Sequence, residues 1–256
     1  MTGFTNVYLD DFTKTVMSDF VSRRRQTGVA NATIRRDLAL LSMIFTCAIE
    51  WGWTENNPVK SFGKQQLREA PPRTTYPSES DIAKLVAVAS PPAVRIIKFL
   101  ASTGMRLEEV CGLEWHQISI KRRELRLTKT KTNSPRTVPL SREALGTILG
   151  TAKHPTSPFV FWNRDGNRYR NFSGYFSRLA KREKVLFRCH DLRHRFASVF
   201  LQRTSNLAAL QAILGYATIT MTMRYSHLMT DHLHSAMHDF DTALGTKVGT
   251  GATVYA

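Results

Sequence analysis

The chain has 256 residues, of which 42% are apolar, and it carries a formal net charge of +16. This apolar content is ordinary for a packed globular protein. No run of about 18 apolar residues occurs and no basic-then-apolar leader follows Met1, so we expect neither a membrane span nor a secretory signal. The three cysteines are widely spaced and form no CxxC pair, which favours reduced thiols in a cytosolic protein.

The positive charge is concentrated in the carboxy-terminal part of the chain. Residues 1–72 hold 9 basic and 7 acidic side chains, whereas the remaining residues hold 27 and 13. A basic surface on that scale suits a polyanionic partner, most simply nucleic acid. The charge alone also fits a solvated basic protein or one that binds an acidic membrane.

Two helices are expected near the amino terminus. Residues 12–25 place apolar side chains on one side, and residues 31–51 repeat them, from Ile34 to Ile49, at steps of three and four. We expect Asn31 to cap the second helix and Gly52 to end it. Arg35 and Arg36 lie off the apolar face, where they are either DNA-phosphate ligands or part of a solvated face.

Pro58 is expected to end the first region, and the polar segment 63–77 is typical of a linker. A new helix is predicted after Ser78, because Ser78-Glu-Ser-Asp81 has capping-box spacing. The apolar run 94–101 predicts a second helix that ends near Gly104.

The periodicity then changes to that of strands. Ile118 and Ile120 alternate with polar residues, residues 121–124 form a turn, and the alternation returns at 125–127. Residues 137–140 predict a third strand, with Pro139 at its end or on an edge. Helical periodicity marks the segments 172–179, 196–201, 207–214 and 233–244.

The predicted fold class is therefore mainly α, with two domains. Residues 1–62 form a small helical domain and residues 63–77 a linker. Residues 78–245 form a larger, mostly helical domain with a small antiparallel sheet, and residues 246–256 form a tail.

Three segments carry the side chains best suited to chemistry: Thr103-Gly-Met-Arg106-Leu-Glu-Glu109, His190-Asp-Leu-Arg193 and Arg224-Tyr225-Ser-His227. Cleavage of a phosphodiester needs a nucleophile, cations for the non-bridging oxygens and an acid for the leaving oxygen. A tyrosine phenol suits the first task, and arginine forks suit the second because they bind two phosphate oxygens at once.

In the order and spacing of these motifs, nearly the whole chain resembles the tyrosine recombinases, also called phage integrases. The resemblance implies that Tyr225 is the nucleophile and Lys131 the acid that protonates the leaving 5′ oxygen. Lys131 fits the family's hairpin lysine better than Lys129, because it lies five residues before Arg136. The phosphate-binding set implied by the resemblance is Arg106, His190 and Arg193, with Glu109 in support.

Tyr216 departs from the family pattern. The resemblance places a histidine, or in some members a tryptophan, nine residues before the nucleophile. A phenol can still donate a hydrogen bond to a phosphate oxygen, but it carries no positive charge at neutral pH. We therefore expect Tyr216 to belong to the site and to affect the rate more than the existence of activity.

The resemblance implies that residues 1–62 are the family's core-binding, SAM-like domain, which binds DNA. It implies a site-specific recombinase that forms a 3′-phosphotyrosyl link to double-stranded DNA without metal, ATP or any other cofactor. It further implies a homotetramer on two DNA sites, accessory DNA-bending or directionality factors, no membrane partner and a cytoplasmic, nucleoid-associated location. Because the first predicted helix lies close to Met1, no additional arm-binding domain is expected. An apolar stripe in 231–244 suggests contact between protomers, and the alternative is that it packs on its own domain.

Several alternatives stay open at this point. A type IB topoisomerase shares the chemistry but relaxes DNA as a monomer, and a decayed integrase scaffold could bind DNA without cutting it. His190 and His194 have the i, i+4 spacing of a zinc pair. However, the glutamate of His-Glu-x-x-His is absent and no third ligand is evident.

Overall fold

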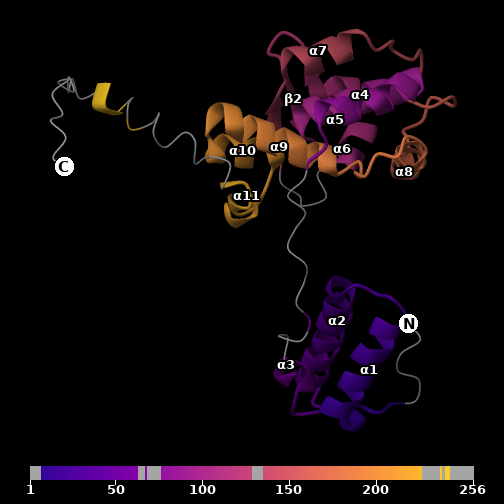
Figure 1. Cartoon of the computed structure of the whole chain (residues 1–256), viewed down its shortest axis with the longest axis vertical. Helices are drawn as coiled ribbons and strands as arrows, with labels where there is room; N and C mark the ends of the chain where they lie inside the picture. Colours follow the sequence, from indigo (N-terminus) through magenta and orange to yellow (C-terminus); the bar gives the residue numbers. More distant parts are fainter. Residues whose placement is uncertain are drawn as a thin grey trace, which may run out of the picture. The chain divides into compact units, whose positions relative to one another are not determined.

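The computed structural model describes residues 7–62, 67, 76–128, 135–226, 237 and 240–242. The chain divides into two compact units, Met1–Arg73 and Thr74–Ala256 (Figure 1). The predicted fold class, mainly helical with a small antiparallel sheet, is confirmed. Lys129, Lys131, His227 and most of the segment 231–244 lie outside the described residues.

The first unit is built from short and long helices around one apolar cluster. Its elements are η1 (Leu9–Asp11), α1 (Lys14–Gln26), α2 (Asn31–Glu50) and α3 (Pro58–Ser61). The Thr13 hydroxyl accepts a hydrogen bond from the Val16 amide and so satisfies one of the free donors at the start of α1. Met17 and Phe20 of α1 pack with Ile34, Leu38 and Phe45 of α2 to form the core.

Three details of this unit differ from the sequence-based expectation. Ala30, with an extended backbone, occupies the cap position of α2, so Asn31 is instead its first helical residue. Pro58 begins α3 rather than ending the region, because its missing N–H costs nothing at a first helical position and the Asn57 side chain caps that helix. Ile49, predicted on the apolar face of α2, is exposed at 36%.

The second unit packs helices around α5. Its helices are α4 (Glu79–Val88), α5 (Pro91–Thr103), α6 (Leu107–Cys111), η3 (Trp115–Gln117), α7 (Arg142–Leu149), α8 (Phe172–Arg182), α9 (Asp191–Thr204), α10 (Leu207–Leu214) and α11 (Thr220–Met223). The predicted capping box at the start of α4 is present, with Ser78 and Asp81 bonded reciprocally. Helix α5 contacts α4, α6, α7 and α9, which explains why its apolar residues are buried on several sides.

The sheet is three-stranded and antiparallel, in the order β1 (Ile118–Ser119), β2 (Glu124–Leu127) and β3 (Arg136–Pro139). Pro139 lies at the end of the edge strand β3, where its lack of an N–H breaks no ladder bond. Ile120 falls in the turn after β1 and is 47% exposed, so the first strand is shorter than predicted.

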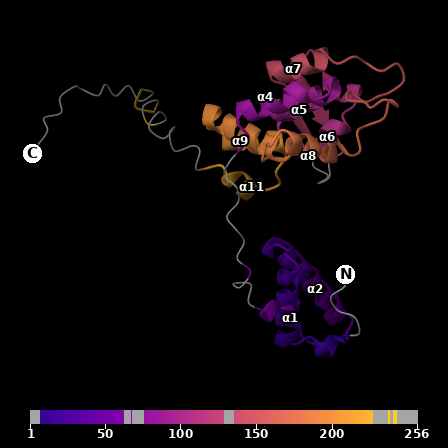
Figure 2. The same cartoon turned by 45° about the vertical axis from the view of Figure 1, so that its right-hand side comes forward.

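A separate apolar cluster joins α9, α10 and the segment that follows them. Ala197 and Leu201 of α9 pack with Leu210 and Leu214 of α10, and the fifth fully buried member is Tyr225. Helix α10 also contacts β3 and α11. Figures 1 and 2 both show α11 on the same side of this unit as α9. The candidate nucleophile therefore sits in a packed cluster and not on a free tail.

Candidate active site

The site begins where α5 ends. Gly104 has φ +63°, a left-handed conformation that favours glycine, and a Cβ there would collide with the Phe196 ring. The chain therefore turns sharply at the end of α5 and starts α6 three residues later. Arg106 is the residue before α6, and its side chain is 24% exposed. This turn places the first predicted phosphate ligand at the surface of the unit.

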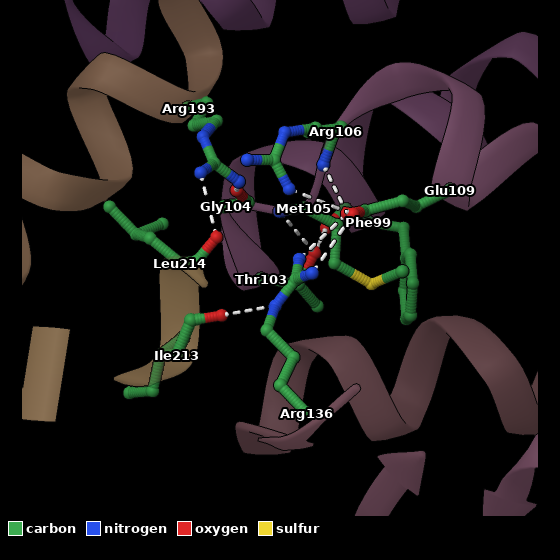
Figure 3. Close-up of polar contacts among 10 residues, drawn as sticks. All are labelled: Phe99, Thr103, Gly104, Met105, Arg106, Glu109, Arg136, Arg193, Ile213 and Leu214. Atoms are coloured by element: carbon green, nitrogen blue, oxygen red, sulfur yellow. Dashed lines mark hydrogen bonds and ion pairs between the residues drawn. The ribbon is translucent and has the colours of Figure 1, made fainter. Parts of the chain in front are cut away.

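Glu109 holds Arg106 through two hydrogen bonds. One carboxylate oxygen accepts from the Arg106 amide at 2.9 Å and the other accepts from its Nη1 at 3.1 Å. Arg136 of β3 binds the same carboxylate with Nη1 at 2.9 Å and Nη2 at 2.7 Å (Figure 3). Burial opposes ionisation of Glu109, but hydrogen bonding and charge from Arg136 and Arg106 outweigh it, so the pKa lies below its usual value.

Arg136 also ties β3 to the end of α10. Its Nε donates to the Ile213 carbonyl at 2.9 Å, and its side chain is only 6% exposed. Gly215, with φ +67°, ends α10, and a Cβ there would lie 2.7 Å from the Arg136 Cδ. The absence of a side chain at Gly215 thus lets Arg136 approach the carboxyl end of α10, where the helix dipole favours a cation.

Arg193 of α9 bonds the carboxyl ends of two other elements. Its Nη1 donates to the Gly104 carbonyl and its Nη2 to the Leu214 carbonyl, each at 2.8 Å (Figure 3). Arg193 is 2% exposed and so is buried inside the second unit, where an unpartnered charge would be costly. Burial lowers the pKa of Arg193, and the nearby charge of Arg106 lowers it further. Arg193 therefore fixes the spacing of α5, α9 and α10.

The two histidines of the His190–His194 segment lie at the start of α9. His190 is the residue before α9, and its ring lies 5.0 Å, centroid to centroid, from that of His194. His190 is thus the cap residue of α9, and Arg193 lies in its first turn. Desolvation and the charge of Arg193 lower the pKa of His190, and burial lowers that of His194 as well. Both histidines are therefore mainly neutral at neutral pH.

The Tyr225 side chain is fully buried, with 0% exposure. Its hydroxyl oxygen lies 2.5 Å from His194 Nδ1, and the Arg224 guanidinium lies 5.9 Å from its ring centre. Burial raises the pKa of the phenol, and the neighbouring Tyr216 phenol raises it further. The hydroxyl consequently keeps its proton in this conformation.

Tyr216 contacts both Arg193 and the cluster that contains Tyr225. The Arg193 guanidinium carbon is 4.9 Å from the centre of the Tyr216 ring, a distance at which the ring face attracts the cation. Its amide donates to the Gln211 carbonyl at 3.3 Å, which continues the end of α10. Tyr216 is half-buried and packs against the Tyr225 cluster. Its neutral ring thus faces both Arg193 and Tyr225.

The second unit therefore brings together five sequence-predicted site residues and one supporting carboxylate. These are Arg106, His190, Arg193, Tyr216, Tyr225 and Glu109. Lys131 lies outside the described residues, between residue 128 and residue 135. Arg35 and Arg36 belong to α2 of the first unit, and both are exposed.

Two residues near the site were not predicted. Arg136 shares the inward face of β3 with the buried Val138, so its position in the strand alternation indicates a charge that needs a partner. The sequence pattern indicates His194 only as half of a zinc pair, although its four-residue spacing from His190 predicts a shared helical face. Within the described ranges, no group of three His, Cys, Asp or Glu side chains is arranged to hold a metal.

No helix in the described part of the chain is both long and apolar enough to cross a membrane. Among solved structures, the fold is similar to the Tn1549 transposon integrase in complex with a circular intermediate DNA. The TM-score is 0.73 at 20% identity, over 91% of this chain and 86% of that one. It is also similar to a lambda integrase tetramer bound to a Holliday junction, with a TM-score of 0.73 at 20% identity, over 87% and 67% of the two chains.

In sequence, the chain is 33% identical to the integrase of Escherichia phage P2 over 227 residues, covering 88% of this chain and 64% of that protein. It spans about two thirds of the length of the curated relatives it matches, at 64%, 68% and 65% for three phage integrases. The model of the phage integrase family matches residues 78–232, which include every site residue of the second unit. The chain belongs to the phage integrase family.

Proposed function

We propose that this chain is a site-specific DNA recombinase that cleaves and rejoins DNA through a 3′-phosphotyrosyl intermediate. The observation that carries the proposal is that Tyr225, Arg106 and Arg193 all belong to the site of one integrase-family domain. Arg106 and Arg193 supply two permanent charges, and Tyr225 supplies the nucleophilic oxygen. These are the parts that phosphoryl transfer to an enzyme side chain requires.

Arg106 is the best-placed phosphate ligand, because it combines partial exposure with an anchored backbone. Glu109 fixes both its amide and its guanidinium, so little rotamer freedom is lost when a phosphate binds. Arg193 uses two of its N–H groups on carbonyls and can direct its remaining donors to the same phosphate. Loss of one such donor costs other enzymes roughly 3–4 kcal/mol in the transition state.

Lys131 is proposed as the acid that protonates the leaving 5′ oxygen. It precedes β3, whose first residue is Arg136, and the Arg136–Glu109 ion pair anchors that strand beside Arg106. Replacement of the leaving oxygen by sulfur removes the need for a proton. The Lys131→Ala variant should therefore be slow on normal DNA and much faster on the sulfur-containing strand.

Double-stranded DNA is the proposed partner, bound by both units as a tetramer on two sites. The DNA-bound Tn1549 integrase and the lambda tetramer on a Holliday junction support this assembly through their shared fold. The net +14 after residue 72 provides the long-range attraction, and exposed Arg35 and Arg36 are proposed phosphate ligands of the first unit. The Tyr216 position next to Arg193 supports a role for its hydroxyl at the phosphate.

The test is incubation with nicked suicide DNA taken from the flanks of the gene. Wild-type protein should form a covalent protein–DNA adduct, and the Tyr225→Phe variant should bind the same DNA without forming it. Recombination between two sites, with little relaxation of supercoiled plasmid, would distinguish a recombinase from a type IB topoisomerase. Failure of the wild-type protein to form any adduct would contradict the proposal and favour a DNA-binding protein without activity.

A further inference from the structure

The hydroxyl of the proposed nucleophile has a specific partner in the structure. The Tyr225 ring is enclosed by α9 and α10 residues, and its oxygen lies 2.5 Å from Nδ1 of His194. That distance is at the short end for a hydrogen bond. His194 lies one helical turn beyond His190 on α9, so the same helix presents Arg193 and the partner of the nucleophile.

The charges around His194 decide which atom holds the proton. Burial, together with the charges of His190 and Arg224, lowers the pKa of His194 to about 4, and the charge of Asp191 opposes this shift. The other groups that face the pair are Arg193, Tyr216 and Tyr76, whose ring centre lies 6.3 Å from that of His194. At neutral pH the imidazole is therefore neutral. Because the phenol retains its proton, Tyr225 donates the hydrogen bond and Nδ1 accepts it.

We propose that His194 is a further catalytic residue, which accepts the hydrogen bond of the Tyr225 hydroxyl and takes its proton as the oxygen attacks the phosphodiester. The inference rests on the proposed recombinase function. In the forward step the bond between Tyr225 Oη and phosphorus forms, the bond from phosphorus to the 5′ oxygen breaks, and the phenolic proton moves to His194 Nδ1. The leaving oxygen takes a proton from the proposed acid, Lys131.

Rejoining reverses each transfer. A 5′ hydroxyl attacks phosphorus, the Tyr225 oxygen leaves, and His194 returns the proton to it, so no external acid, base or oxidant is needed. A neutral imidazole is suited to this role because it accepts through one ring nitrogen while the other carries the hydrogen. Because the ion pair that would form with Tyr225 is unfavourable in the free protein, the transfer accompanies bond formation to phosphorus and does not precede it.

His190 is left free for the phosphate by this assignment. Its ring lies beside His194 and not between His194 and Tyr225, and its position before α9 places it at the end of the helix nearest Arg193. His190 is therefore assigned to the phosphate, and His194 to the hydroxyl of the nucleophile. This division explains the four-residue spacing without a metal ion.

Two substitutions at position 194 separate proton transfer from mere orientation. In His194→Asn the side-chain oxygen occupies nearly the place of Nδ1 and accepts the same hydrogen bond, but it cannot take a proton at neutral pH. His194→Leu removes the acceptor as well. His116→Asn is the matched control, because His116 is 72% exposed on η3 of the same unit. Unfolding temperature and DNA affinity are measured for all three variants.

The assay is single-turnover formation of the covalent adduct on suicide DNA between pH 6 and 9. Loss of a general base typically slows a reaction about 10²- to 10⁴-fold, and we expect losses in this range for both His194 variants but not for His116→Asn. The rate of His194→Asn should rise about tenfold per pH unit as hydroxide ionises the phenol, whereas the wild-type rate should change little. An Asn variant within threefold of wild type at every pH overturns the proposal.

A more acidic phenol provides the second measurement. Fluorinated tyrosine incorporated at position 225 ionises at lower pH, so it should restore much of the rate in His194→Asn and little in wild type. Sulfur in place of the leaving oxygen should rescue Lys131→Ala but not His194→Asn. If fluorination leaves the His194→Asn defect unchanged, His194 is a packing residue. If the wild-type protein forms no adduct, the recombinase proposal itself has failed.

Discussion

Replacement of Arg136 by Met should destabilise the second unit by about 3–5 kcal/mol at neutral pH, because it leaves one partner of a buried ion pair behind. Both the Arg136 and Glu109 side chains are 6% exposed. The substitution removes two hydrogen bonds to Glu109, at 2.9 and 2.7 Å, and one to the Ile213 carbonyl. Arg106 still binds Glu109, which places the expected loss toward the lower end of that range.

The loss should depend on pH with a defined sign. The pKa of Glu109 is lowered in the native protein, so the pair's contribution to stability is complete above the unfolded pKa of about 4.5 and is lost as the pH falls through the lower native value. In Arg136→Met, the charge and hydrogen bonds of Arg136 no longer offset the effect of burial, so the pKa of Glu109 should rise. The variant's deficit should therefore be largest near pH 7 and should shrink toward pH 4.5, where the stranded carboxylate takes a proton.

Urea unfolding can report this unit alone. The chain has 4 tryptophans, of which Trp51 and Trp53 lie in the first unit. With those two replaced by Phe, fluorescence follows only Trp115 and Trp162. At a slope of about 2–3 kcal/mol per molar urea, the loss moves the midpoint by about 1–2 M.

Arg126→Met is the matched control, since Arg126 pairs with Glu124 within the same strand, β2, and the Arg126 side chain is 62% exposed. Such exposed pairs contribute about 0–1 kcal/mol. The double variant Arg136→Met with Glu109→Gln should recover part of the loss, because no unpaired charge remains buried. Equal midpoints for Arg136→Met and Arg126→Met, or a double variant less stable than the single one, would show that the Arg136–Glu109 pair does not stabilise this unit in the way expected.

Three further results are expected. Arg106→Ala and Arg193→Ala should each slow single-turnover cleavage by raising its activation free energy by about 3–4 kcal/mol. Only Arg193→Ala should also lower the urea midpoint strongly, because it leaves two buried carbonyls without a hydrogen-bond donor. Equal stability of the two variants would contradict that structural role. Arg35→Gln with Arg36→Gln should reduce the log–log salt slope of DNA affinity by about 0.9 for each phosphate that these side chains neutralise in the wild-type complex, whereas an unchanged slope in an anisotropy titration would place both outside the interface. Tyr216→Phe should slow cleavage while Tyr216→His retains or raises it, and wild-type rates for Phe would make Tyr216 a packing residue.

Local sequence patterns predicted the elements whose stability depends on their own periodicity and caps. The apolar steps of α2 and the Ser78–Asp81 capping box are encoded within one or two helical turns, and both are present. Asn31 failed as a cap because capping depends on where the extended backbone ends, and Ala30 holds that conformation. Ile49 lies at the last turn of α2, where a residue at the edge of the apolar face is left exposed.

The predicted site residues followed from spacing within motifs, but their connections did not. Arg136 is 27 residues from Glu109 and 77 from Ile213, so its three bonds arise only when β3, α6 and α10 pack together. The bond between His194 and Tyr225 spans 31 residues and likewise depends on the packing of α9 against the Tyr225 segment. A local pattern indicates that such a charge or imidazole needs a partner, whereas tertiary packing selects which one.

The most direct test of the central claim is identification of the residue that becomes linked to DNA. Wild-type protein is trapped on suicide DNA, digested with trypsin and nuclease, and the nucleotide-bearing peptide is sequenced by mass spectrometry. One modified peptide is expected, with a 3′-linked nucleotide on Tyr225. A nucleotide on any other side chain, or a 5′ linkage on Tyr225, would contradict it.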